Sequence, residues 1–348
     1  MAQIRFLVFL MIILCFEYVD CIRDMAEMYE KYQKMFHSHD PVDYHVHHHN
    51  HHNHHKHPHK YHHSNYTYDN QEEWCTLPQD TECCGTHQSP VRLDSFIKPV
   101  PMKPFEFINY KMLPWNVEIA NNGRTVSVFF NNVNAQVKGG GLKHTYNLYS
   151  LIFHWGSEHV VNKVRAPLEL QLIHYNSKFS DVHSAVESGE PDALAIIAVF
   201  YWLGRDAPEA VHTITSELTK VWYKNKMDYI PPFNLRELLP QSTTHFYRYN
   251  GSMTTPNCNE VVVWTVFKDP NFISLIQLKK FYAVKTVTKR PAYGPDSNMN
   301  LLHNYRKTQE LYNRTVVLGE VTVSKFTDTE IPAVTVEEVK TSEEIETS

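Results

Sequence analysis

Asn147-Leu-Tyr-Ser-Leu-Ile-Phe-His-Trp-Gly-Ser-Glu-His159 is a run of alternating residues that ends in a turn at Gly156. The alternation predicts a β-strand with Ser150, Ile152 and His154 on one face and Leu151, Phe153 and Trp155 on the other. A lone histidine on such a half-apolar face is more often a hydrogen-bonded core residue than a metal ligand. The stretch therefore predicts a strand, and it does not by itself predict a site.

A second predicted strand, Pro167 to Tyr175, changes this interpretation. Glu169, Gln171 and Ile173 alternate there with leucines, so they share one face of the strand. Two such strands side by side would gather polar side chains on one face of a sheet. Such a group of polar side chains can form a cup-shaped metal site, or it can be the remnant of a former metal site.

The first 21 residues have the pattern of a secretory signal peptide. Arg5 precedes an apolar run from Phe6 to Phe16 that is too short to span a membrane. Cleavage after Cys21 would leave four cysteines, Cys75, Cys83, Cys84 and Cys258, and an even number in a secreted chain predicts two disulfides. No other apolar stretch is long enough to cross a bilayer. We therefore expect a secreted, extracellular protein that does not span the membrane.

Residues 22–70 form a histidine-rich tract that we expect to be disordered, because it has too little apolar surface to offset the entropy of ordering. Its twelve clustered histidines are His45, His47, His48, His49, His51, His52, His54, His55, His57, His59, His62 and His63. Imidazole is the commonest side-chain ligand for zinc, copper and nickel, so the tract predicts loose, multivalent binding of such ions. The alternative is a solubilising linker whose charge rises as the pH falls through about 6.5. Asn65-Tyr-Thr67 is an N-glycosylation sequon within it.

Residues 71–321 are predicted to form one folded domain, and residues 322–348 an acidic disordered tail. Turn signals separate short alternating runs, which are typical of strands: Thr125 to Phe130, Leu148 to Phe153, Leu168 to Tyr175, Ala193 to Trp202 and Glu260 to Phe267. The helix candidates are Ala210 to Lys224 and Ile273 to Ala283. The pattern predicts an α+β fold, mostly β, with a large and mostly antiparallel central sheet and peripheral helices.

The domain resembles the α-carbonic anhydrases over nearly its whole length. The matching motifs, in order, are Gln88-Ser-Pro-Val91, Asn121-Asn-Gly123, Lys138-Gly-Gly-Gly-Leu142, Phe153-His-Trp-Gly156, Ser157-Glu-His159, Glu169-Leu-Gln-Leu-Ile-His-Tyr-Asn176, Leu194-Ala-Ile-Ile-Ala-Val-Phe200, Gly251-Ser-Met-Thr-Thr-Pro256 and Val262-Val-Trp264. Each motif is short, but their order and spacing together are highly specific. The resemblance implies a single domain of this family.

The same resemblance implies that two of three zinc ligands are missing. The family holds zinc with three histidines, and the corresponding positions here are Ile152, His154 and Gln171. An aliphatic side chain cannot bind a metal, and a neutral amide oxygen is a poor zinc ligand beside imidazole. We therefore expect His154 as a remnant ligand and no cofactor bound in the core.

Around the two lost ligand positions, some residues match those of the family and others do not. Thr254 matches the hydroxyl that contacts the metal-bound hydroxide, Glu158 matches the carboxylate that orients this hydroxyl, and Thr255 is also present. Arg124 stands at the position of the proton-shuttle histidine and cannot release a proton near neutrality. Glu169 matches a carboxylate behind the third ligand, Ser150 matches the amide behind the first, and an apolar wall persists as Ile173, Ile196 and Trp264. The resemblance implies a vestigial site with no catalytic residue.

The resemblance also bears on the disulfides and the sequons. Secreted members pair a cysteine after the Thr-Thr-Pro loop with one before the Gln-Ser-Pro motif, so Cys258 would pair with Cys83 or Cys84, and Cys75 with the other. Asn250-Gly-Ser252 and Asn313-Arg-Thr315 are formal sequons inside the domain, and we do not expect them to be used.

Three hypotheses for function follow. The first is a non-catalytic carbonic-anhydrase-related protein that binds metal through the tract and an extracellular protein, glycosaminoglycan or mineral through the domain. The second is an active zinc enzyme that recruits another ligand, such as His144, His183 or a histidine of the tract. The third is a structural, nacrein-like matrix protein involved in biomineralization. The near-neutral pI of about 6.5 and the scattered basic residues argue against nucleic acid.

Overall fold

The computed structural model describes residues 66–77, 81–94, 97–130, 133–205, 207–289 and 299–322. The predicted signal peptide, nearly all of the histidine tract with Asn65, and all but the first residue of the acidic tail lie outside these residues.

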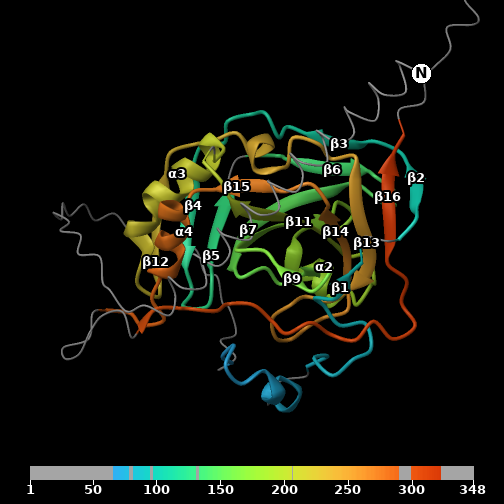
Figure 1. Cartoon of the computed structure of the whole chain (residues 1–348), viewed down its shortest axis with the longest axis horizontal. Helices are drawn as coiled ribbons and strands as arrows, with labels where there is room; N and C mark the ends of the chain where they lie inside the picture. The colour runs from blue at the N-terminus through green and yellow to red at the C-terminus, as the bar shows by residue number, and fades with distance from the viewer. Residues whose placement is uncertain are drawn as a thin grey trace, which may run out of the picture.

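One twisted sheet runs through the whole domain and is mixed in strand direction (Figure 1). Its main strands, in spatial order, are β12 (Lys226–Ile230), β4 (Val117–Asn121), β5 (Val126–Phe130), β7 (Tyr146–Trp155), β10 (Leu168–Asn176), β11 (Leu194–Leu203), β14 (Val262–Phe267), β13 (His245–Gly251), β16 (Val317–Val321) and β2 (Pro99–Met102). Added to this path are β3 (Phe105–Ile108), β6 (Gln136–Gly139) and β15 (Asn271–Ile273). A small separate sheet contains β1 (Arg92–Leu93), β8 (Val160–Val161) and β9 (Val164–Arg165).

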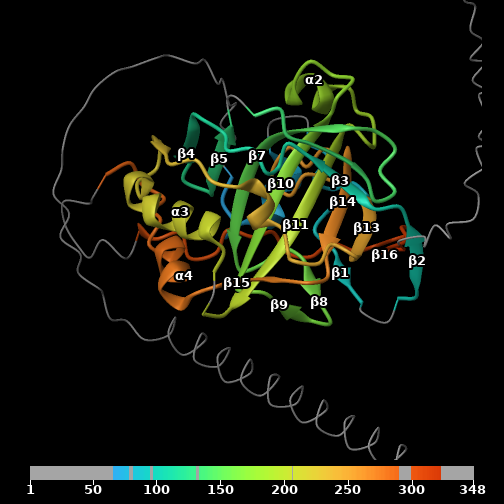
Figure 2. The same ribbon diagram turned by 90° about the horizontal axis from the view of Figure 1, so that it is seen from above.

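The predicted fold class is confirmed, and most neighbouring strands are antiparallel. Parallel pairing in the large sheet occurs where β11 meets β14 and β15 and where β16 meets β2. The predicted strands agree with β5, β7, β10, β11 and β14 to within a few residues at their ends. Figure 2 shows β7, β10 and β11 crossing the middle of the molecule side by side.

The helices lie at the periphery. They are α2 (Val182–Glu187), α3 (Glu209–Glu217) and α4 (Leu275–Tyr282), with 3₁₀ turns η1 (Gln71–Thr76), η2 (Leu218–Val221) and η3 (Leu235–Leu238). The predicted helix Ala210 to Lys224 is wrong in its second half, because the chain tightens into η2 after Glu217. Thr215 donates its hydroxyl proton back to Val211 O at 2.8 Å, a bond that disfavours a straight helix.

Two hydrophobic clusters cover the two faces of the central strands. Leu151, Phe153 and Trp155 belong to one cluster, and Ile152 packs against the other, as the alternation predicts. His154, Glu169 and Gln171 therefore lie on the side of the sheet that contains Ile173, Ile196 and Trp264.

The folded part begins before residue 71, where the sequence analysis placed its start. Tyr66 and Tyr68 meet the ring of Trp74 edge-on, with centroids 5.2 and 5.8 Å away, and Trp74 Nε1 donates to Thr67 O. These aromatic contacts hold the last residues of the segment 22–70 against the domain.

Two disulfides anchor this N-terminal part of the domain. Cys83 bonds to Cys258, and Cys75 bonds to Cys84. The expected pair of bridges is present, and the alternative left open for Cys258 is resolved in favour of Cys83. No helix among the described residues is long and apolar enough to cross a membrane.

Candidate functional site

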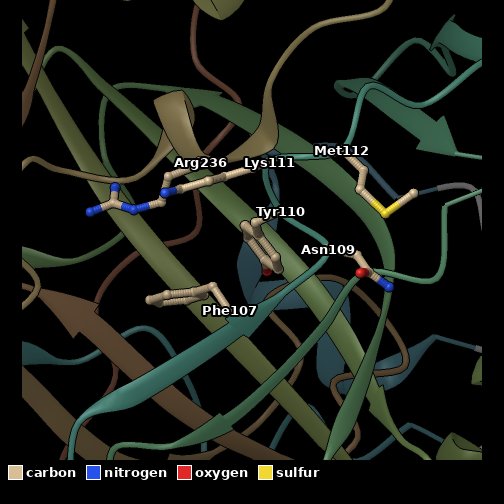
Figure 3. Close-up of a pocket in the computed structure, with 6 residues that line it drawn as sticks. All are labelled: Phe107, Asn109, Tyr110, Lys111, Met112 and Arg236. Carbon is tan, nitrogen blue, oxygen red and sulfur yellow. The ribbon is translucent and has the colours of Figure 1, made fainter.

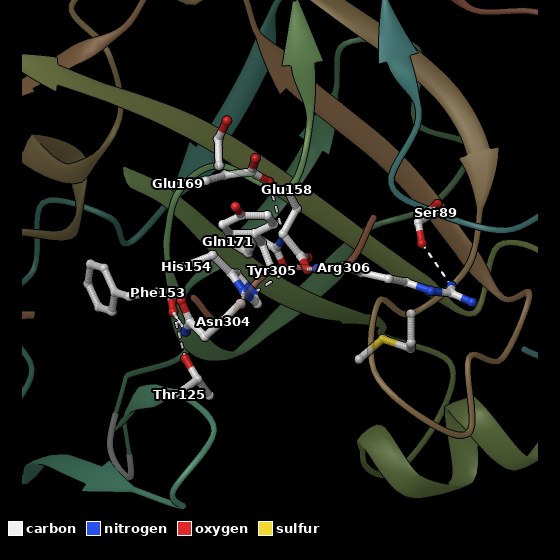
Figure 4. A network of polar contacts seen from close by, with 12 residues as sticks. Ser89, Thr125, Phe153, His154, Glu158, Glu169, Gln171, Asn304, Tyr305 and Arg306 are labelled. Atoms are coloured by element: carbon white, nitrogen blue, oxygen red, sulfur yellow. Dashed lines mark hydrogen bonds and ion pairs between the residues drawn. The ribbon is translucent and has the colours of Figure 1, made fainter. Parts of the chain in front are cut away.

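The three positions of the expected metal cup come together in the middle of the sheet. Ile152 on β7 stands directly opposite Gln171 on β10, and His154 stands opposite Glu169. Gln171, His154 and Glu169 are buried, with exposed fractions of 2% or less. The site is therefore a closed polar cluster within the sheet face (Figure 4).

Gln171 uses its amide nitrogen to join two carboxylates. Gln171 Nε2 donates to Glu158 Oε2 at 2.9 Å and to Glu169 Oε1 at 3.0 Å. Carboxylates accept hydrogen bonds and cannot donate them when ionised, so they fix the orientation of the amide. The donor end of Gln171 therefore faces the acids, and no amide proton is left over.

His154 is held from behind by a backbone carbonyl. Its Nδ1 donates to Asn304 O at 2.5 Å, and its Nε2 lies 3.6 Å from Glu158 Oε2. The nitrogen available for a ligand is thus Nε2, and the nearest charged atom to it is a carboxylate oxygen. An ion pair forms here in the state in which His154 carries a second proton.

Glu158 takes its remaining hydrogen bond from the chain itself, because Arg306 N donates to Glu158 Oε1 at 2.8 Å. A hydrogen bond between Glu158 and Thr254 was expected from the resemblance, and none is present among the described residues. The amide of Gln171 occupies the carboxylate oxygen Oε2 instead. The expected carboxylate–hydroxyl pair is therefore wrong, although Thr254 is buried.

Glu169 lies in a second, linked chain of hydrogen bonds. His159 donates to it twice, through its backbone N–H and through Nδ1, both at 2.9 Å. Burial alone raises the pKa of Glu169, but the charge of His159 and the hydrogen bonds from His159 and Gln171 outweigh it and lower the pKa to about 2. His159 Nε2 contacts Tyr249 Oη at 2.7 Å, which in turn donates to Ser89 Oγ. Glu169 is thereby held as a carboxylate.

Arg306 ties the cluster to the N-terminal segment. Its guanidinium donates to Gln88 Oε1, Ser89 O and Cys83 O at 2.7–3.1 Å. Burial lowers the pKa of Arg306 to about 10, and the carboxylates of Glu158 and Glu260 oppose this shift. Arg306 and Asn304 could not be recognised from the sequence as site residues, because nothing in their local sequence links them to His154, about 150 residues away.

Arg124 and Thr255 meet through a tyrosine that the sequence analysis also missed. Arg124 Nε donates to Tyr66 O at 3.1 Å, and its guanidinium carbon lies 4.2 Å from the centre of the Tyr66 ring. Burial raises the pKa of Tyr66 to about 12, while Arg124 and a hydrogen bond with Thr255 oppose the shift. Its position inside the segment assigned to the histidine tract, residues 22–70, concealed its role.

Two substitute ligands considered for an active enzyme lie far from the cluster. His144 precedes β7, and His183 lies in α2 after the end of β10. Tyr146 on β7 pairs with Asn176 on β10, so both histidines lie at the opposite end of the strands from His154. Eight residues of extended strand separate Tyr146 from His154, which is about 26 Å at 3.3 Å per residue. His144 instead pairs with Asp192 at 3.4 Å.

The donor set does not suit a zinc ion. Ile152 has no atom that could bind a metal, and Gln171 turns its N–H groups toward carboxylates. Of the three imidazoles that would hold zinc, only His154 is present. Within the described ranges, the structure brings together no group of three or more His, Cys, Asp or Glu side chains that could hold a metal ion. The tract histidines lie outside these ranges.

A concave site of about 510 Å³ lies on the other side of the sheet (Figure 3). It is lined by Phe107, Asn109, Tyr110, Lys111, Met112 and Arg236. Tyr110 belongs to the hydrophobic cluster that contains Leu151, and not to the cluster around Trp264. The site is therefore separate from the polar cluster.

Comparison with known proteins agrees with this architecture. The profile of the eukaryotic-type carbonic anhydrase family matches residues 69–319. Human carbonic anhydrase 12 is 34% identical over 268 residues, which cover 73% of this chain and 72% of the relative. Putative carbonic anhydrase 3 of Caenorhabditis elegans is 34% identical over 256 residues, 68% of this chain and 94% of the relative.

A human protein named carbonic anhydrase-related protein is similar to the same degree. It is 34% identical over 247 residues, which cover 67% of this chain and 83% of the relative. The family profile spans more than half of the chain, and the identities lie above 30% over two thirds of it. The chain belongs to the family of eukaryotic-type carbonic anhydrases.

Proposed function

We propose that this chain is a secreted carbonic-anhydrase-related protein that does not hydrate carbon dioxide. It binds divalent transition metal ions through its histidine tract and contacts an extracellular partner or matrix through its domain. The observation that carries the proposal is the orientation of Gln171, whose amide nitrogen bonds to Glu158 and Glu169.

The orientation of Gln171 matters because zinc hydration chemistry needs a metal held by three donors beside an open position. A ligand must present a lone pair to the metal, and Gln171 presents N–H groups to carboxylates instead. Turning the amide over would place its oxygen against the two carboxylates and leave each of them one hydrogen-bond donor short. The cluster is therefore satisfied without a metal, and a single imidazole at His154 is a weak site for one.

Secretion is supported by the two disulfides. Disulfides persist in oxidising compartments and are rare in the cytosol. Cys83–Cys258 is buried around Cys258, whereas Cys84 of the other bridge is exposed to solvent. An exposed bridge is open to cytosolic reductants, so a bridge at this position is better suited to an extracellular location.

Partner binding is supported by apolar side chains beside the concave site. Met112, Leu113 and Trp115 have exposed fractions of 58%, 64% and 69%, and they lie in one loop before β4. Exposed large apolar residues grouped in this way mark interaction sites more often than isolated ones do. Lys111 and Arg236 add positive charge to the same region.

The test separates the domain from the tract. We would measure zinc, copper and nickel content and carbon dioxide hydration for the full chain and for a variant with the twelve clustered histidines between His45 and His63 replaced by glutamine. The full chain should bind several ions and the variant none, and neither should hydrate carbon dioxide. One tightly held zinc with sulfonamide-sensitive hydration in the variant would show that the domain is an enzyme.

The nature of the partner requires a second measurement on the native protein. Recovery from an acid-insoluble mineral matrix would support a structural role like that of nacrein-like proteins. Recovery from body fluid in complex with another protein would support a soluble partner.

A further inference from the structure

The chain contains three N-glycosylation sequons, at Asn65, Asn250 and Asn313. Asn65 lies outside the described residues, so the structure distinguishes only the other two. We propose that Asn313 carries an N-linked glycan, contrary to the expectation from the sequence alone, and that Asn250 does not. The proposal rests on the proposed secretion, because the transfer takes place in the secretory pathway.

The packing of the fold explains why the residues of the Asn250 sequon are present. Asn250 lies on β13 opposite Val263, and the next two residues are buried. Ser252 Oγ accepts the Ser89 N–H at 2.9 Å and donates to Met253 O at 2.7 Å. A Cβ on Gly251 would lie 2.1 Å from Ser89 Oγ, so only glycine fits between them. These residues are present because they pack β13 against the Gln88-Ser-Pro segment.

The sequon at Asn313 has no such explanation. Asn313 and Thr315 are both exposed, and no hydrogen bond of either side chain is found in the part of the chain that the structure describes. They lie in the segment that leads into β16, which is next to the edge strand β2 of the large sheet (Figure 1). The acceptor amide and the hydroxyl that the transferase requires are thus both open to solvent.

A tight turn presents Asn313. Arg314 N donates to Leu311 O at 3.1 Å, which closes a four-residue turn with Tyr312 and Asn313 at its tip. Tyr312 has a φ of 49° and an exposed fraction of 64%. The Arg314 guanidinium donates to the carbonyls of Glu310, Leu311 and Asn250, so the base of the turn is fixed while its tip projects. A bulky glycan can occupy this tip without displacing any packed side chain.

The reaction requires one co-substrate, an oligosaccharide linked to a lipid through pyrophosphate. The amide nitrogen of Asn313 bonds to the anomeric carbon of the sugar and loses one proton, and the lipid pyrophosphate leaves. The hydroxyl of Thr315 is the feature of the acceptor that the transferase recognises. At Asn250 the equivalent hydroxyl is withdrawn into the fold as β13 forms.

The test is site-specific mapping on the full chain secreted from a eukaryotic cell. Peptide N-glycosidase in heavy-oxygen water converts each glycosylated asparagine to a labelled aspartate, which peptide mass spectrometry locates. A sample without the enzyme is essential, because Asn250-Gly251 is a dipeptide that deamidates spontaneously and takes up the same label. We expect nearly complete labelling at Asn313 and no labelling above this background at Asn250.

Substitutions at the sequons identify the glycosylated asparagine without the heavy-oxygen label. Asn313→Gln and Thr315→Val should each remove one glycan from the secreted protein, seen as increased gel mobility, whereas Asn250→Gln should change nothing. All three positions are exposed, so folding should be preserved. Label at Asn65 without label at Asn313 would overturn the proposal and leave secretion intact. An unlabelled protein retained in the cytosol with reduced cysteines would overturn both.

Discussion

Gln171 donates one amide proton to Glu158 at 2.9 Å, and both side chains are buried in the middle of the sheet. Its second amide proton goes to Glu169, so one neutral side chain holds two carboxylates. The stability of the cluster therefore depends on a residue at a position where the family places a metal ligand.

Replacement of Gln171 by leucine should destabilise the domain by about 3 kcal/mol, because it leaves two buried carboxylates each short of a donor. Urea unfolding followed by tryptophan fluorescence measures the change. Gln241→Leu, at an exposed position, serves as the matched control and should fall within about 0.5 kcal/mol of the parent. An equal effect of the two substitutions would show that the amide bridge contributes nothing.

Histidines at both lost positions should create a zinc site. Ile152 and Gln171 are directly opposite on adjacent strands, and His154 is two residues from Ile152 on the same face. The double variant Ile152→His with Gln171→His, in the chain with the tract histidines replaced, should retain close to one zinc per chain after dialysis, because three imidazoles then converge. Each single variant should remain nearly metal-free. A double variant without zinc would show that the scaffold no longer holds the geometry.

Stability should fall as the pH is lowered from about 6.5 to about 4, because of His174. Burial lowers the pKa of His174 to about 4, although its Nδ1 hydrogen bonds to Ala195 O and Leu172 O oppose the shift. The unfolded chain takes up a proton below its ordinary pKa of about 6.5, whereas the folded chain does so only below about 4. The contribution of His174 to the free energy of unfolding is thus complete above pH 6.5 and is lost progressively as the pH falls to about 4. It amounts to about 3 kcal/mol.

The variant His174→Gln isolates this contribution. Glutamine does not titrate, and it can donate to Leu172 O and accept the Tyr110 hydroxyl, which lies 2.5 Å from His174 Nε2. Its unfolding free energy should depend less steeply on pH between 4 and 6.5 than that of the parent. His183→Gln, at an exposed position, should keep the parental slope. Parallel slopes for parent and His174→Gln would contradict the assignment.

The two disulfides should differ in their stabilising effect. Cys83 and Cys258 are 175 residues apart in sequence, and Cys75 and Cys84 are 9 residues apart. By loop-closure entropy the first bridge contributes about 5 kcal/mol and the second about 3 kcal/mol. Paired alanine variants, compared by denaturant unfolding, should reproduce this order. The opposite order would mean that strain or residual structure, and not chain entropy, governs the difference.

Period-two alternation and motif spacing predicted the central strands well. The face that carries Ile152, His154 and Gln171 and the apolar character of the other face are both as expected, because alternation is a local property of a strand. The end of α3 could not be predicted, since it depends on how Thr215 uses its hydroxyl.

The polar cluster was predictable in its residues on the strands but not in its hydrogen bonds. The direction of the Gln171 amide depends on Glu158, and the second oxygen of Glu158 depends on Arg306 N. These partners come from separate parts of the chain, so no local pattern indicates them. The expected Glu158–Thr254 pair failed for this reason.

The segment around Asn304 and Arg306 also determines when the domain can finish folding during synthesis. It supplies the carbonyl for His154 and the N–H for Glu158, and shortly afterwards β16 pairs with β2, 219 residues earlier in the chain. A nascent chain that ends before residue 304 contains nearly all residues of both hydrophobic clusters but still lacks the hydrogen-bond partners of His154 Nδ1 and Glu158 Oε1. Contacts between such distant residues form slowly. The domain should therefore reach its native state only after the ribosome has released nearly all of it.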